Sequence, residues 1–263
     1  MKITICLCIL LISASAFSDT SFLKNKTVVG CEHEDGYPPF IFKNPESGKL
    51  EGYSIDVLNL VFKNSGAKVE YELLPWKRCL EYMTQSNRMD LVLTAASTDE
   101  RREKYLFSDA FAEVHLAYFY DRARYPKGLS INNPIDLDNM GEVCGMRGWE
   151  YGDYGLSKKV WKVAHEYQQL IELVIIERCD VMLIRYEIFK NLPKAIRDSI
   201  YYNRMKGGII PWRKDNPIKF YFMSIKYSSY HNKLVNFINN RLVQIRKSGK
   251  LRDIKEKYGF MIN

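Results

Sequence analysis

Arg101 is the residue whose type and position point most directly to chemistry. The pattern Ser97-x-x-Glu100 has the form of a capping box, so it predicts a helix that begins there with Arg101 in its first turn. Free N–H groups and the positive dipole end at a helix N-terminus, together with a guanidinium fork, suit a carboxylate. The alternative is a solvated surface arginine, the role that suits Arg102 beside it.

The titratable residues indicate binding rather than catalysis. The acid-rich run Glu32-His33-Glu34-Asp35 places Glu34 where it could meet a cationic group of a ligand; the alternative is a solvated loop, and a single histidine there is a weak metal signal. Glu34 and Glu150 could act as a general acid or base, but nothing pairs either with a second catalytic group. No Ser/His/Asp or His-Glu-x-x-His arrangement includes His33, His115, His165 or His231. We therefore expect no enzyme and no cofactor.

The elements that must position Arg101 are an alternation of strands and helices. The β-branched run Thr27–Cys31, the alternating residues 68–73 and the run Asp90–Thr94 each predict a strand. Apolar residues at helical spacing lie between these runs and predict helices, the first of which stops at Gly66. Such an alternation indicates a parallel α/β sheet.

A second, similar alternation begins after residue 120. Glu142–Met146 predicts a strand, Gly148 a turn, Tyr167–Ile176 a helix and Cys179–Ile184 a buried strand. The tail is helical, with an apolar stripe that ends at Gly249. No flexible linker separates the two halves. We therefore expect two α/β lobes joined by short strands, with a cleft between them.

The start of the chain sets the expected compartment. Residues 1–16 combine Lys2, a short apolar run and the small-x-small pattern Ala14-Ser15-Ala16, which is typical of a cleaved signal peptide. The alternative is a buried N-terminal helix. The apolar run is too short for a membrane anchor. We expect an exported protein in the periplasm.

Export gives the cysteines an oxidising compartment. Loss of Cys6 and Cys8 with the signal peptide leaves four cysteines, an even number that suggests disulfides and allows three pairings. We favour Cys31–Cys79 and Cys144–Cys179, because each pair stays within one lobe. The rival is a zinc site, but no Cys-x-x-Cys spacing is present.

Composition and charge exclude several classes. The 263 residues are 46% hydrophobic and 27% charged, which is ordinary globular composition and excludes disordered and fibrous proteins. The net charge of +8 comes from dispersed lysines and arginines, so we expect no nucleic-acid partner. A basic surface suits anionic ligands or an anionic membrane face. Nothing demands an oligomer, and we expect a monomer.

The run from Tyr37 to Phe111 resembles the periplasmic amino-acid-binding proteins, the family 3 solute-binding components of ABC transporters. Gly52-Tyr53-Ser54-Ile55-Asp56 is similar to a family signature, with Ser54 in place of the first acid. Thr98-Asp99-Glu100-Arg101 followed by Phe107-Ser108-Asp109 is the most specific match. The resemblance extends more weakly through Gly145-Met146-Arg147-Gly148 and the tail Ser248–Phe260.

The resemblance implies a two-lobed, type II periplasmic binding fold. Residues 17–115 would form the first part of lobe 1, residues 116–220 lobe 2, and residues 221–263 the return to lobe 1. Ligand would lie in the interlobe cleft, which closes by hinge motion. Arg101, selected by its six-residue spacing to Phe107, would hold the ligand carboxylate. The resemblance also implies that Thr94, Ala96 and Thr98 offer backbone and hydroxyl groups to the ligand, with simple turn roles as the alternative. It implies side-chain contacts from Tyr37 and Trp76, with core packing as the alternative.

Lobe 2 departs from the family pattern. Five residues after Asp180 the family has an acid that pairs with the ligand ammonium. This sequence has Arg185 at that position. With Arg147 at the Gly-rich turn, the cleft could hold three arginines and favour an anionic or dicarboxylic solute. Trp149 and Tyr151 follow that turn and could contact the ligand. The alternative is that Arg185 points away and Glu187 serves instead.

Three functions compete. The first is an extracytoplasmic protein that captures a small carboxylate-bearing solute, an amino acid or other organic anion, for an ABC transporter permease. The second is a sensory or interaction module of the same fold that acts on a membrane sensor. The third is a periplasmic enzyme similar to cyclohexadienyl dehydratases. We favour the first.

Overall fold

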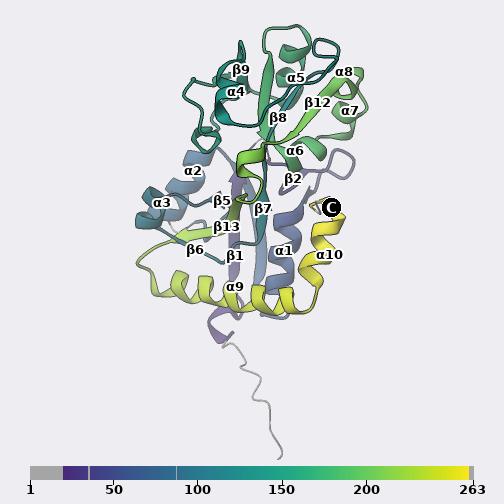
Figure 1. Ribbon diagram of the computed structural model, residues 1–263. Helices are drawn as coiled ribbons and strands as arrows, with labels where there is room; N and C mark the ends of the chain where they lie inside the picture. Colours follow the sequence, from purple (N-terminus) through teal and green to yellow (C-terminus); the bar gives the residue numbers. More distant parts are fainter. Residues whose placement is uncertain (1–19, 35, 87, 261–263) are drawn as a thin grey trace, which may run out of the picture.

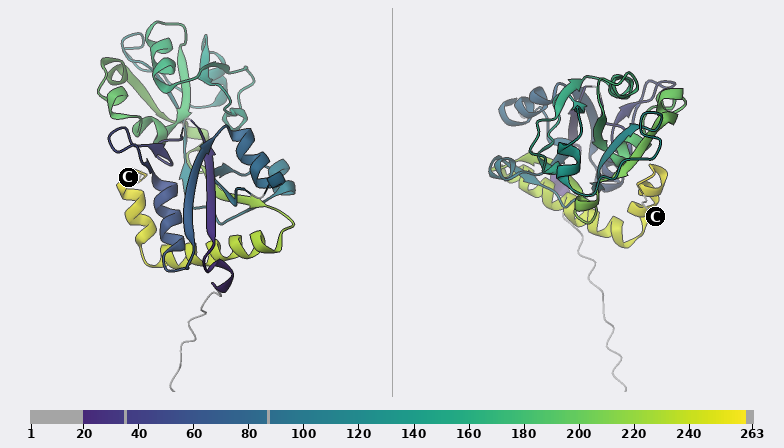
Figure 2. Two further views of the ribbon diagram at one scale, coloured as in Figure 1. Left: turned by 180° about the vertical axis from the view of Figure 1, so that it is seen from behind. Right: turned by 45° about the horizontal axis from the view of Figure 1, so that its top comes forward.

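The computed structural model describes residues 20–34, 36–86 and 88–260 (Figure 1). The chain forms two lobes, each a mixed β-sheet with helices packed on it, as the two views of Figure 2 show. The expected signal peptide at residues 1–16 lies outside the described residues. No helix in the described ranges has the length and apolar character to cross a bilayer.

Lobe 1 is built on a sheet with the strand order β4-β1-β5-β13-β6, and β7 also pairs with β13. β1 is parallel to β4 and β5, but β13 is antiparallel to β5, which corrects the expectation of a purely parallel sheet. The reason is that β13 enters this sheet from the other lobe. The strands are β1 (Thr27–His33), β4 (Lys68–Leu74), β5 (Leu91–Ala96), β6 (Tyr105–Phe107), β7 (Ala112–Val114) and β13 (Ile218–Ile225), beside a small hairpin of β2 (Phe42–Lys43) and β3 (Leu50–Glu51).

The long helices of lobe 1, α1 and α9, each bury one apolar face, whereas α3 buries no residue. The stripe of Leu234, Ile238, Leu242 and Ile245 is buried, which is the role that its spacing predicts. Gly249 has a left-handed φ of 78° and separates α9 from α10. The helices are α1 (Tyr53–Phe62), α2 (Trp76–Glu81, continued by a π-helical turn at Tyr82–Ser86), α3 (Asp99–Lys104), α9 (Ser229–Lys247) and α10 (Lys250–Lys257).

The cap of α3 differs from the predicted one. Thr98, not Ser97, is the N-cap, because its backbone is extended and its Oγ1 accepts the Arg101 N–H at 3.2 Å. The capping box predicted at Ser97 is therefore wrong by one residue. Arg101 still lies in the first turn of the helix.

Lobe 2 is built on a sheet with the strand order β10-β9-β11-β8-β12. β9, β10 and β11 are parallel, while β8 and β12 run antiparallel to their neighbours. The strands are β8 (Leu116–Asp121), β9 (Val143–Met146), β10 (Trp161–Ala164), β11 (Val181–Arg185) and β12 (Met205–Ile209). The helices are α4 (Pro134–Asp138), α5 (Tyr167–Ile175), α6 (Tyr186–Lys190), α7 (Lys194–Arg197) and α8 (Ile200–Arg204).

Two connections join the lobes. The chain leaves lobe 1 at β7 and enters lobe 2 at β8, with only His115 between them. It returns between β12 and β13, so lobe 1 pairing resumes at Ile218 rather than at residue 221. Both disulfides stay within a lobe, as predicted: Cys31–Cys79 closes 48 residues of lobe 1 and Cys144–Cys179 closes 35 residues of lobe 2.

Candidate ligand-binding site

Arg101 and three other predicted ligand residues meet at the carboxyl end of β5. Nη1 of Arg101 donates to the Ala96 carbonyl at 2.9 Å, and its guanidinium carbon lies 5.3 Å from the centroid of the Trp76 ring. Thr98 caps the helix that carries it. These contacts hold a partly buried cation at one strand end, where α/β proteins bind ligands.

Thr94 lies on the same strand but is buried. Its Oγ1 is 3.0 Å from Oγ of Ser54, the residue that stands where the family signature has an acid. Thr94 is 7% exposed and Ser54 is fully buried. The serine thus provides a neutral hydrogen-bond partner for the threonine.

Glu32 is a site residue that the sequence reasoning missed. It is 3% exposed at the carboxyl end of β1; Oε1 accepts the His33 N–H at 3.0 Å, and Oε2 has no hydrogen-bond partner within the described structure. Burial raises the pKa of the Glu32 carboxyl to about 7, although hydrogen bonds from His33 and Thr94 oppose that shift. Glu34, the acid predicted to face a ligand, is exposed. The predicted strand stopped at Cys31, but β1 runs two residues further and includes Glu32. A longer predicted strand would have placed Glu32 at the strand end and thus near the site.

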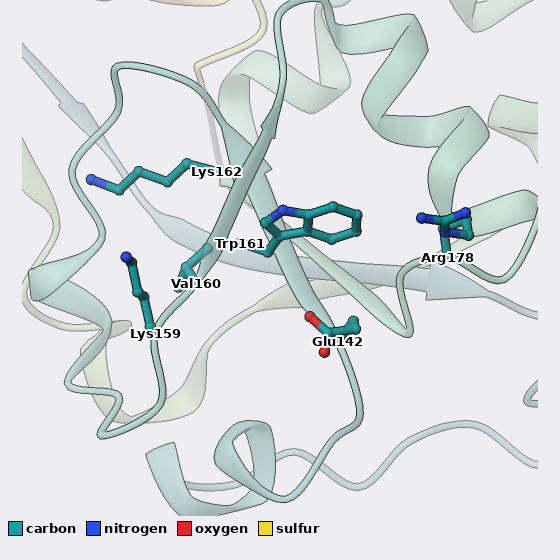
Figure 3. A pocket seen from close by; sticks show the side chains of 6 residues that line it. All are labelled: Glu142, Lys159, Val160, Trp161, Lys162 and Arg178. Atoms are coloured by element: carbon teal, nitrogen blue, oxygen red, sulfur yellow. The ribbon is translucent and has the colours of Figure 1, made fainter.

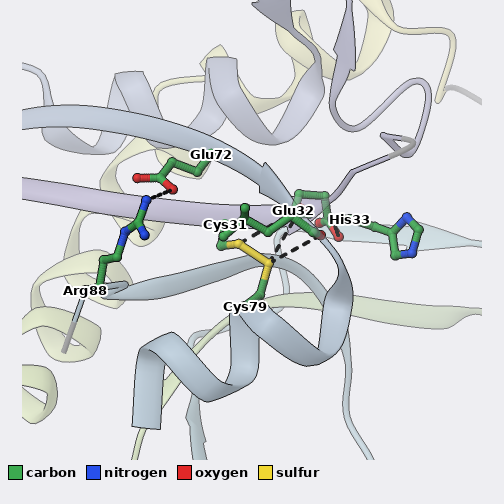
Figure 4. The surroundings of a disulfide bond; sticks show 7 residues. Cys31, Glu32, His33, Glu72, Cys79 and Arg88 are labelled. Atoms are coloured by element: carbon green, nitrogen blue, oxygen red, sulfur yellow. Dashed lines mark hydrogen bonds and ion pairs between the residues drawn. A yellow bond between two sulfur atoms is a disulfide. The ribbon is translucent and has the colours of Figure 1, made fainter. Parts of the chain in front are cut away.

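The Cys31–Cys79 disulfide ties two parts of this site together. Cys31 precedes Glu32 on β1, and Cys79 lies one helical turn after Trp76 on α2. Figure 4 shows Glu32 beside the disulfide. A covalent link therefore fixes the strand end that carries the acid against the helix that carries the aromatic ring.

Arg185 is the corresponding buried charge of lobe 2. It ends β11 and is 8% exposed. Nη2 makes a long hydrogen bond of 3.4 Å to the Glu150 carbonyl, and Nε and Nη1 have no partner among the described residues. Its guanidinium carbon lies 5.7 Å from the ring of Trp149 and 5.8 Å from that of Tyr154. Arg185 therefore faces aromatic rings and does not point away into solvent.

The Gly-rich turn of lobe 2 uses Tyr151 to hold its own backbone. The Tyr151 hydroxyl accepts the Met146 N–H at 2.6 Å. A Cβ at Gly145 would lie 2.3 Å from the Tyr151 ring, so the close approach requires glycine. Arg147, predicted as a third cleft arginine, is exposed on this turn.

Tyr37 connects the two lobes. Its ring centroid lies 5.6 Å from that of Trp149 in lobe 2 and 5.5 Å from that of Phe40 in lobe 1. Burial raises the pKa of the Tyr37 phenol; the charge of Arg185 lowers it, and the charge of Glu32 raises it. The phenol is therefore neutral at pH 7 and is influenced by both buried charges, one from each lobe.

Glu187 is engaged by the interlobe connection. Oε2 accepts the His115 backbone N–H at 2.8 Å, and Oε1 lies 2.8 Å from His115 Nδ1. The Glu187 side chain is only 2% exposed, and both of its carboxylate oxygens contact His115. Glu187 is thus occupied, in contrast to Arg185.

A surface depression of about 700 Å³ lies elsewhere, on lobe 2 (Figure 3). None of the residues predicted to contact ligand lines it. Its lining is Glu142, Lys159, Val160, Trp161, Lys162 and Arg178. The depression is separate from the residues gathered between the lobes. No group of three or more potential metal ligands occurs in the described ranges.

Comparison with known proteins identifies the family. Residues 29–261 match the bacterial extracellular solute-binding proteins, family 3. The chain belongs to this family. It is therefore a binding protein of the amino-acid-binding type and not an enzyme, and its fold is the type II periplasmic binding fold.

Individual relatives agree with this assignment. The L-cystine-binding protein TcyA of Bacillus subtilis is 32% identical over 239 residues, which cover 90% of this chain and 82% of the relative. An ABC uptake transporter substrate-binding protein from Streptococcus pneumoniae, solved with bound histidine, has a TM-score of 0.70 at 20% identity and covers 91% of this chain and 94% of its own. A histidine kinase sensor domain also has a TM-score of 0.70, at 18% identity, and the match covers 90% of this chain and 96% of the sensor domain. The fold is thus shared by transport and sensory proteins.

Proposed function

We propose that this protein captures a small, amino-acid-like carboxylate between its two lobes and delivers it to an ABC transporter permease. The observation that carries the proposal is the placement of Arg101, whose guanidinium is fixed by Ala96 and Trp76 at the carboxyl end of β5. A guanidinium held in one orientation can form a bidentate pair with a carboxylate. Thr94 and Thr98 would supply further hydrogen bonds, and Tyr37, Trp149 and Tyr151 would enclose the solute.

Membership of the same family supports the proposed compartment and partner. One relative is named as an L-cystine-binding protein and a similar solved structure holds bound histidine, which supports an amino-acid-like solute here. Two intramolecular disulfides suit an oxidising periplasm. We propose a monomer that carries solute from the periplasm to the permease, without nucleic acid as a partner.

Binding is tested by thermal shift and calorimetry on purified protein freed of endogenous solute. The panel holds amino acids, dicarboxylates and keto acids. A solute at 100 times its Kd stabilises the protein by about 2.7 kcal/mol, which is a measurable rise in Tm. We expect Arg101→Ala to abolish the response and Arg102→Ala, the exposed neighbour, to preserve it.

The partner is tested by transport. The protein with its cognate permease in proteoliposomes should drive ATP-dependent uptake of the solute identified above. Uptake that fails while the protein captures a membrane kinase ectodomain would assign it to sensing instead. Slow chemical conversion of the bound solute would contradict a pure binding role.

A further inference from the structure

Arg185 is a buried cation that lacks an anionic partner in the described structure. Its guanidinium makes a long hydrogen bond to the Glu150 carbonyl and interacts with the neutral Tyr154 hydroxyl, and no ion pair of Arg185 occurs within the described ranges. The surrounding phenols cannot compensate its charge, since burial raises the pKa of Tyr37 and Tyr151 and keeps both neutral. An unpaired buried charge is costly, and a hydrogen-bonded anion beside it offsets much of that cost.

The nearest acid in the sequence does not serve as that partner. Glu187 is two residues away, but both of its oxygens bind His115. Those contacts hold the junction between β7 and β8. Among the described residues no acid forms an ion pair with Arg185, which leaves its charge available to an anionic group of a ligand.

Glu32 presents the opposite case in lobe 1. Its Oε2 is buried and makes no hydrogen bond of normal geometry with a described residue, although Thr94 lies close enough to lower the pKa of the carboxyl. A buried acceptor of this kind normally receives one or two hydrogen bonds. Glu32 lies one residue before the end of β1, which pairs with β5, the strand that leads to Arg101. The ring of Tyr37 lies 5.6 Å from that of Trp149, and the guanidinium carbon of Arg185 lies 5.7 Å from the same Trp149 ring. Arg185 therefore faces the region that Tyr37 spans between the lobes, and the charge of Glu32 also raises the pKa of the Tyr37 phenol.

We propose that Arg185 binds a second acidic group of the solute and Glu32 binds its ammonium, so that the protein takes an amino dicarboxylate. This inference rests on the proposed function, in which Arg101 holds the first carboxylate. Two cations and one anion in the site, Arg101, Arg185 and Glu32, complement a ligand with two carboxylates and one ammonium. Such a ligand would pair each buried charge that the protein leaves open.

The charge balance separates this class from others. A neutral amino acid leaves Arg185 without an anion, and a cationic one places like charge beside it. A dicarboxylate without an amine leaves Glu32 either ionised and unpaired or protonated. Omitting a charged hydrogen bond in a site built for it typically reduces affinity about tenfold to a hundredfold.

Four solutes test the proposal on the wild-type protein by calorimetry. L-glutamate carries all three groups, L-glutamine lacks the second acid, 2-oxoglutarate lacks the amine, and L-aspartate shortens the spacing. We expect glutamate or aspartate to bind at least tenfold more tightly than glutamine and than 2-oxoglutarate. Equal or tighter binding of glutamine would overturn the assignment of Arg185, and equal or tighter binding of 2-oxoglutarate would overturn that of Glu32.

Variants assign each group to its residue. Arg185→Met keeps the length and apolar packing of the stem, and it should reduce the preference for glutamate over glutamine to less than about threefold. Arg185→Lys keeps the charge and should retain part of that preference. This variant provides the second measurement if the methionine variant fails to fold. Glu32→Gln should remove the preference for glutamate over 2-oxoglutarate. An unchanged preference in either variant would overturn the corresponding role.

Failure of this inference is distinguishable from failure of the proposed function. If a monocarboxylate amino acid binds and the binding is lost in Arg101→Ala, solute capture stands and the amino dicarboxylate class is wrong. If no carboxylate gives an Arg101-dependent response, both are wrong.

Discussion

His115 Nδ1 lies 2.8 Å from Oε1 of Glu187, at the single residue that separates β7 of lobe 1 from β8 of lobe 2. The second oxygen of Glu187 accepts the His115 backbone N–H, so one carboxylate holds both the side chain and the main chain of the connection. This pair explains why an acid close to Arg185 in sequence does not neutralise it. Glu187 belongs to the interlobe junction and leaves Arg185 open.

The first prediction concerns that junction. Glu187→Ala removes a buried acceptor from two donors of His115, and we expect it to lower the free energy of unfolding by about 1–3 kcal/mol. The order of affinities among solutes should persist, because both oxygens of Glu187 are engaged by His115. Urea unfolding and calorimetry check both parts. A variant of unchanged stability that loses all solute binding would show that Glu187, rather than Arg185, serves the ligand.

The second prediction concerns the ionisation of Glu32. The pKa of its carboxyl is about 7 in the native protein, against 4.5 for the unfolded chain. The unfolded state therefore ionises first as pH rises, and the native state loses stability between about pH 4.5 and pH 7, by up to about 3 kcal/mol.

Glu32→Gln cannot ionise and should escape this loss. Its Tm relative to wild type, without ligand, should increase between pH 4.5 and pH 8. Glu34→Gln is the matched control, because Glu34 is exposed. A constant difference between Glu32→Gln and wild type across this range would contradict the raised pKa.

The third prediction concerns the two disulfides. Loops of 48 and 35 residues are close in length, so loss of either bond should cost a similar free energy of unfolding, about 4 kcal/mol by chain entropy. Their effects on binding should differ. Cys31→Ser/Cys79→Ser releases the strand end of Glu32 from the helix of Trp76, and we expect it to weaken solute binding at least tenfold more than Cys144→Ser/Cys179→Ser does.

The second disulfide is a suitable control because Cys179 precedes β11, at the opposite end of that strand from Arg185. Calorimetry at a temperature where both variants are folded makes the comparison. Equal losses of affinity would show that the disulfide of lobe 1 has no special role in the site.

The fourth prediction concerns the turn of lobe 2. Gly145→Ala places a methyl group 2.3 Å from the ring of Tyr151, and the required shift should cost about 1–3 kcal/mol. Gly208→Ala is the control, because a Cβ there meets nothing within 4 Å. Thermal unfolding of both variants tests it. A Gly145→Ala protein as stable as the control would mean that Tyr151 can move, and that its bond to Met146 is weaker than the geometry indicates.

Local pattern determined the elements of this protein. Strand alternation at residues 68–73 and the apolar stripe from Leu234 to Ile245 each predict an element that the structure contains, because one-sided burial leaves a period in the sequence. The disulfide pairing was also accessible, since covalent partners within one lobe follow from the order of the elements. The resemblance around Thr98 and Arg101 identified the family.

Only the tertiary structure decided which charges are buried and which are paired. Glu32 and Glu34 are two residues apart in one acidic run, yet one ends a strand inside the molecule and the other is exposed. Arg185 and Glu187 are equally close, yet the acid binds His115, a residue 72 positions away, and the arginine packs against aromatic rings. Sequence records the charge of a side chain, but its desolvation and its partners depend on contacts between distant segments, which exist only once the two lobes have formed.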